Sequence, residues 1–247
     1  VGAYENNIQI ESICNLEVEP FSYEELLSDA SQELTRCLIT LKSIQDYLYD
    51  NLLKLKGVTE TVGTLKNYYE KFYDESICLV CPFCGLAPML TSKDDFREAF
   101  DHYLPRSKYP FVSLLRENLF PSCHTCNSTY KGTKNLRDYG KVFYPFTTES
   151  NDCEPLINIR AGVIENLEIK SENFQEEITT WNEVFGINNR IKNFADVNIS
   201  GWMSNFQEVM KNYNVDYEHA KSSEIKSCNS NRMQDYNFIK KAILEAL

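Results

Sequence analysis

Long apolar runs are missing from this sequence, as are low-complexity tracts and internal repeats. No stretch of the 247 residues approaches the roughly 18 to 20 consecutive apolar residues that a membrane-spanning helix needs. The first residues also lack the basic, apolar and small-residue series of a signal peptide. We therefore expect a soluble, cytoplasmic protein that has no membrane partner.

Basic residues are in deficit. The chain has 25 lysines and arginines against 36 aspartates and glutamates, which gives a net charge of -11. This balance argues against broad binding to polyphosphates, so any nucleic-acid site must be local. Hydrophobic residues make up 43% of the chain and aromatic residues 13%, which excludes disorder and allows a sizeable core.

The N-terminal part of the chain has the hydrophobic spacing of helices. Helical spacing runs from Ser22, which opens a Ser-x-x-Glu capping box, to Leu52, and predicts one long helix or two shorter ones. Gly57 and Gly63 bracket a break, after which we expect a further helix that ends near Asp74.

The C-terminal part combines one strand pair with further helices. Residues 156–159 and 163–169 alternate around an Ala-Gly dipeptide, which predicts two strands joined by a turn. Helical spacing returns over residues 173–247. Residues 221–231 are rich in serine and asparagine, and we expect a loop there.

Cysteine is the first sign of a specific site. Four of the nine cysteines form two Cys-x-x-Cys pairs, a pattern typical of metal binding in a reducing compartment. Four thiolates suit tetrahedral zinc without an open coordination position, and hence a structural metal. The alternative is four buried thiols. The expected ligands are Cys81, Cys84, Cys123 and Cys126.

Three short motifs lie within the region that the cysteine pairs define. They are Asp-His-x-x-Pro from Asp101, Asn-Leu-x-Pro from Asn118 and Cys-x-x-Cys-Asn-x-x-x-Lys-Gly from Cys123. In this order and spacing they resemble the HNH, or ββα-metal, endonuclease family in its zinc-bound subclass. The resemblance covers about residues 81–132, a fifth of the chain.

Residue chemistry independently suits phosphodiester hydrolysis, which needs a base, a cation and fixed geometry. His102 is the candidate base because its ordinary pKa lies near neutrality. The resemblance implies that Asn118 holds the loop that orients His102, and that Asp101 and Asn127 bind a hard divalent ion, magnesium or manganese. Many relatives of that family carry histidine where this chain has Asn127.

Positive charge is concentrated around these motifs. Residues 96–142 contain eight basic and four acidic residues, a net charge of +4, whereas the rest of the chain carries -15. Phosphate attraction should therefore be focused on the motif region. The best candidates for contacts to a nucleic-acid backbone are Arg106, Lys108, Lys131 and Lys134, although basic side chains that serve only solubility give a similar pattern.

These observations predict an α+β fold: a mostly helical chain that carries a zinc-stabilised ββα-metal nuclease motif. We expect an N-terminal helical region over residues 1–75, a nuclease core with its zinc site over 76–145, and a strand pair followed by helices over 146–247.

The expected function is a metal-dependent HNH endonuclease that acts on nucleic acid, DNA rather than RNA. The overall pattern also resembles HNH subunits of bacterial anti-phage systems of the Septu and retron-associated types, which implies an ABC-type ATPase partner. Two alternatives stay open. One is a non-catalytic zinc-binding interaction module, and the other is an HNH nuclease of restriction or mobile-element type.

Overall fold

The computed structural model divides the chain into two compact units. One unit comprises the residues up to 76 together with 89–138 and 144–147, and the other comprises 77–88, 139–143 and 148–247. The structure describes residues 23–28, 30–76, 79–91, 93–94, 97–145, 152–232 and 234–247. Ser22 of the expected capping box lies outside the described residues.

The three regions expected from the sequence stay a prediction, because each unit is discontinuous and draws on more than one of them. The described residues form helices and two small antiparallel sheets, so the α+β class is confirmed. None of the helices in the described ranges combines the length and the apolar character that crossing a membrane requires.

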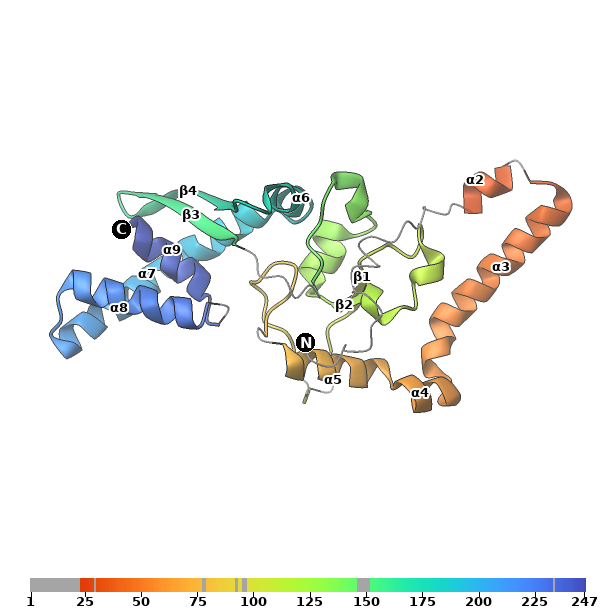
Figure 1. Cartoon of the computed structure of the whole chain (residues 1–247), viewed down its shortest axis with the longest axis horizontal. Helices are drawn as coiled ribbons and strands as arrows, with labels where there is room; N and C mark the ends of the chain where they lie inside the picture. The colour runs from red at the N-terminus through yellow and green to blue at the C-terminus, as the bar shows by residue number, and fades with distance from the viewer. Residues whose placement is uncertain are drawn as a thin grey trace. The chain divides into compact units, whose positions relative to one another are not determined.

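The described residues of the first unit begin with four helices, labelled in Figure 1: α2 (Tyr23–Ser28), α3 (Gln32–Asn51), α4 (Lys56–Val62) and α5 (Leu65–Glu75). The expected long helical segment is therefore two helices. Ser31 caps α3, because its hydroxyl accepts a hydrogen bond from the Leu34 amide. The break expected between Gly57 and Gly63 was wrong in its extent, since α4 spans this segment up to Val62 and Gly63 ends the helix with φ 78°.

A short antiparallel hairpin lies at the centre of the first unit. Strand β1 (Phe100–His102) pairs with β2 (Leu119–Pro121), and the π-helix η4 (Thr125–Lys131) follows the second strand. Helix α5 packs on this hairpin. The buried Tyr68 ring stacks on Phe100 with their centroids 5.4 Å apart, and its hydroxyl lies 3.1 Å from the Leu119 carbonyl oxygen.

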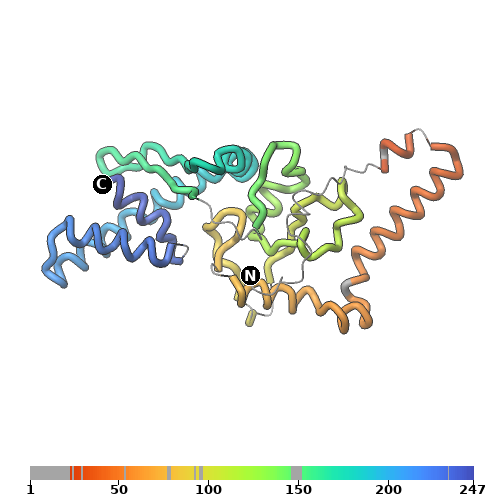
Figure 2. The backbone as a smooth tube through the Cα atoms, viewed as in Figure 1, coloured from red at the N-terminus to blue at the C-terminus, as the bar shows by residue number. Residues whose placement is uncertain are grey.

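The described residues of the second unit form a β-hairpin and four helices. Strand β3 (Glu154–Arg160) turns back into β4 (Val163–Lys170), as the tube in Figure 2 shows. Ala161 and Gly162 make the turn, both with positive φ. The expected strand pair and the return to helices are therefore confirmed. The helices are α6 (Gln175–Phe185), α7 (Ile187–Tyr213), α8 (Tyr217–Ser230) and α9 (Asn237–Ala246).

The loop expected over residues 221–231 was wrong, because α8 spans most of it. The Asp216 side chain caps this helix by accepting a hydrogen bond from the His219 amide at 2.9 Å. Ala220 and Cys228, two turns apart, are buried. Tertiary packing of this face outweighs the low helix propensity of serine and asparagine.

Candidate metal centre and active site

Each cysteine pair lies on a tightly turned backbone. Between Cys81 and Cys84 the chain reverses, and the Cys81 carbonyl oxygen accepts hydrogen bonds from the amides of Cys84 at 3.3 Å and Gly85 at 2.8 Å. Gly85 adopts φ 65°, which a side chain would disfavour. In the second pair, the Cys126 amide lies 3.5 Å from the Cys123 sulfur at the start of η4.

The structure brings the four predicted cysteines together. Their Sγ atoms all lie within 4.8 Å of one another, and all four residues are buried. Zinc bound at about 2.3 Å from each thiolate places tetrahedral sulfurs about 3.8 Å apart, so the cluster fits this ion after a small contraction. Since the protein would fill every coordination position, the site is compatible with a structural zinc.

The predicted base, His102, ends strand β1 and is held by a main-chain group. Its Nε2 lies 3.0 Å from the Ser113 carbonyl oxygen. A carbonyl can only accept, so Nε2 carries the proton, and in the neutral ring Nδ1 keeps its lone pair. Burial lowers the pKa of His102 to about 4, and the charges of Lys131 and Arg106 act in the same direction. The imidazole is therefore neutral at pH 7.

Asn118 fixes the segment that supplies this acceptor. Its fully buried side chain accepts a hydrogen bond from the Leu104 amide at 2.7 Å. It donates to the carbonyl oxygens of Leu104 and Val112, each at 3.1 Å. Because Ser113 follows Val112, these bonds hold the chain on both sides of the segment that orients His102. They are the bonds that the expected loop-holding role requires.

Asp101 is buried beside His102 and forms an ion pair. Its Oδ1 lies 2.8 Å from Lys131 Nζ, which also donates to the His102 carbonyl oxygen at 2.7 Å. Burial raises the pKa of Asp101, and Lys131 counteracts this effect. The second oxygen, Oδ2, is buried and has no hydrogen-bond partner among the described residues. That oxygen is a suitable ligand for a cation.

Lys131 is placed differently from the other predicted phosphate contacts. Its side chain is 1% exposed and lies inside the unit, where it neutralises Asp101. A backbone-phosphate contact by Lys131 would require it to leave this pair. Arg106, Lys108 and Lys134 are half-buried; Arg106 lies 4.0 Å from Asp46 and Lys108 lies 2.8 Å from Asp138.

Asn127, the other predicted ligand of the divalent ion, lies on η4. It is half-buried and precedes Lys131 by four residues, about one turn of this helix. Lys131 in turn contacts Asp101. The π-helix therefore carries one expected metal ligand, Asn127, and also Lys131, which pairs with the other expected ligand, Asp101.

Tyr49 contacts His102 from outside the motifs. The two ring centroids are 5.4 Å apart with a tilt of 40°, and the Arg106 guanidinium lies 4.2 Å from the Tyr49 ring centroid. The sequence predicted only that Tyr49 belongs to a helix. No spacing signal links it to His102, because α3 and β1 are far apart in the chain. The Ser113 carbonyl was also missed, since main-chain acceptors leave no residue signature.

Comparisons with known proteins add one partial similarity. No protein-family model matches the chain, and no solved structure matches it. The chain is 33% identical over 107 residues to Protein ea31 of Escherichia phage lambda. This similarity covers 36% of the chain and 34% of that protein, so the chain spans about a third of the length of that relative.

Removing Lys131 should destabilise the protein strongly. Lys131→Met leaves the Asp101 charge buried without its partner, and we expect a loss of about 3 kcal/mol in the free energy of unfolding, measured by urea denaturation. Lys108→Met breaks an exposed pair with Asp138 and should leave stability nearly unchanged. Equal losses in the two variants would contradict the structural role of Lys131.

Metal analysis of the purified chain should find one zinc ion per molecule. Cys123→Ser should release it, because a hydroxyl is a poor replacement for a thiolate in this site. Cys153→Ser is the matched control, since Cys153 is half-buried and lies outside the cluster. Zinc retained in full by Cys123→Ser would exclude this cluster as the binding site.

Proposed function

We propose that the chain is a metal-dependent endonuclease of the HNH type that hydrolyses phosphodiester bonds of nucleic acid, DNA rather than RNA. One observation carries the proposal. The His102 ring is tethered through Nε2 to the Ser113 carbonyl oxygen, which leaves Nδ1 as the proton acceptor, and the preceding residue, Asp101, is a buried carboxylate. A binding module has no need of a histidine held in one tautomer.

In this proposal His102 acts as the general base. Its Nδ1 takes a proton from the water molecule that attacks the phosphorus atom, while Nε2 stays bonded to Ser113. Asn118 keeps the acceptor in place, so the ring does not rotate as its charge develops. Lys131, bonded to the His102 carbonyl oxygen, fixes the backbone of the same residue.

The donor set suits a hard divalent ion. Asp101 Oδ2 is buried without a hydrogen-bond partner among the described residues, and Asn127 offers an amide oxygen. These two residues would hold magnesium or manganese, which supply positive charge against the phosphate and the leaving oxygen when bound. The side chains of Arg106 and Lys108, which are partly accessible to solvent, support binding of a polyanion.

A protein partner is the second part of the proposal. Helix α3 leaves several large apolar side chains exposed, at 48% for Leu34, 50% for Ile44 and 61% for Tyr47. Exposed apolar side chains on one helix favour an interaction surface. Together with the resemblance to anti-phage nuclease subunits, they support a defence effector that acts with an ATPase.

Cleavage of plasmid DNA, single-stranded DNA and RNA with magnesium or manganese tests the proposal. We expect the parent to cleave DNA, alone or with its partner, and His102→Ala to lose at least about a hundredfold in rate. His219→Ala is the control, because His219 is exposed in the other unit. A His102→Ala variant as active as the parent would refute the mechanism. A zinc-loaded parent that stays inactive with its partner would favour the interaction module.

The pH dependence of cleavage follows from the lowered pKa of His102. The base is lost only when the ring is protonated, so the rate should stay on its plateau from pH 8 down to about pH 5. For a histidine with the ordinary pKa of about 6.5, protonated rings would outnumber neutral rings by about thirty to one at pH 5. A rate that falls tenfold per pH unit below 6.5, with the fold intact by circular dichroism, would contradict the buried neutral ring.

A further inference from the structure

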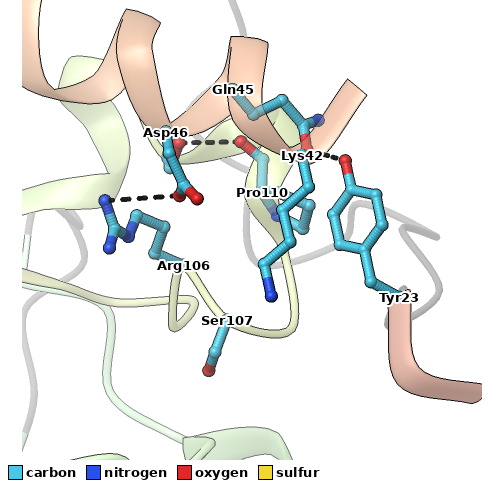
Figure 3. Close-up of a pocket in the computed structure, with 8 residues that line it drawn as sticks. Tyr23, Lys42, Gln45, Asp46, Arg106, Ser107 and Pro110 are labelled. Carbon is cyan, nitrogen blue, oxygen red and sulfur yellow. Dashed lines mark hydrogen bonds and ion pairs between the residues drawn. The ribbon is translucent and has the colours of Figure 1, made fainter. Parts of the chain in front are cut away.

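A cavity of about 300 Å³ lies in the first unit between α2, α3 and the segment that follows β1 (Figure 3). Two of its lining side chains are cationic, Lys42 and Arg106, and one is anionic, Asp46. Lys42 extends from α3 towards the loop that carries Arg106 and Ser107. A cavity with two cations and a hydroxyl group at its edge suits a phosphate group.

Two residues that line this cavity are linked to His102 by contacts. Ser113 lines it, and the carbonyl oxygen of Ser113 holds the imidazole. Arg106 also lines it, and its guanidinium lies over the Tyr49 ring that packs against His102. A phosphate in the cavity would therefore lie close to the group that the proposed reaction uses.

Gln45, one of the lining residues, has a side-chain donor without an acceptor among the described residues. Gln45 Nε2 is buried and has no hydrogen-bond partner among the described residues, while Gln45 Oε1 accepts from the Tyr23 hydroxyl. A buried donor without an acceptor is costly, and an oxygen-rich ligand would relieve that cost. The Lys42 ammonium lies 5.8 Å from the Tyr23 ring centroid at the same edge.

Asp46 forms an ion pair with Arg106. The two side chains are 4.0 Å apart and about half exposed, so water screens their attraction. A phosphate group can bind a guanidinium through two parallel hydrogen bonds and carries a full negative charge of its own. It can therefore displace Asp46 from Arg106.

We infer that this cavity binds a backbone phosphate of the nucleic-acid strand, next to the phosphate that is cleaved, with Lys42 and Arg106 as its contacts and Asp46 as its competitor. The inference rests on the proposed nuclease function. It extends the substrate site beyond the hairpin motifs to α3, a helix that the motifs do not include.

The test measures strand binding by fluorescence anisotropy, with a labelled 15-nucleotide single strand and a duplex of the same sequence. The parent chain is used without added divalent ions, so that no cleavage occurs. Lys42→Gln should weaken binding about three- to tenfold near 0.1 M salt and lower the salt slope by about 0.7 to 0.9. Asp46→Asn should tighten binding about two- to fivefold.

Two matched variants separate a local contact from general charge effects. Lys56→Gln removes a cation from α4, where it pairs with Glu60, and Asp50→Asn removes an anion one turn after Asp46 on α3. Both residues lie outside the cavity lining, and both variants should bind like the parent. The inference is overturned if Lys42→Gln weakens binding no more than Lys56→Gln does.

Inorganic phosphate as a competitor identifies the occupant. If Lys42→Gln reduced competition by phosphate but left strand binding unchanged, the cavity would take free phosphate and the inference would be wrong. Because binding is measured without catalysis, this test can distinguish a failure of the cavity assignment from a failure of the nuclease proposal. A parent that does not cleave even with its partner, yet binds a strand through Lys42, would refute the nuclease and keep the assignment of a phosphate site to the cavity. Zinc content and circular dichroism confirm that each variant folds.

Discussion

The buried ion pair between Lys131 and Asp101 is the constraint on which the candidate site depends. A lysine whose side chain is 1% exposed is stable only with its charge compensated, and here a carboxylate and a main-chain carbonyl do so. The pair joins η4 to the last residues of β1. It therefore fixes the backbone of His102. Only Oδ1 of Asp101 contacts Lys131, so Oδ2 is available to bind a cation.

Around this pair, the position of His102 is set mostly by main-chain carbonyl groups that accept hydrogen bonds. Asn118 bonds the chain at Leu104 and Val112, and the next residue, Ser113, supplies the carbonyl that holds His102. Burial then keeps the ring neutral, since charging it would require desolvation. Main-chain acceptors thus position the proposed base, and the sequence around the motifs carries a local excess of positive charge.

The features that could be predicted from the sequence are those encoded by local residue patterns. The cysteine cluster was predictable because the spacing within two short motifs encodes it, and the hairpin of β3 and β4 because alternation does. His102 was named from a short motif in the same way, and its role stays a prediction. Lys131 was predicted to contact a nucleic-acid backbone, since one sequence cannot show that this residue of η4 pairs with the buried Asp101 of β1. Tyr49 and α8 depend on tertiary packing, which residue pattern and propensity do not report.

The central claim is that His102 is a neutral imidazole tethered through Nε2 to Ser113. Long-range proton–nitrogen correlation spectra of the ring at pH 7, assigned by comparison with a variant that lacks His102, test it most directly. The account predicts a neutral ring with its proton on Nε2. A protonated ring, or a proton on Nδ1, would contradict it, because neither leaves Nδ1 able to take a proton from water.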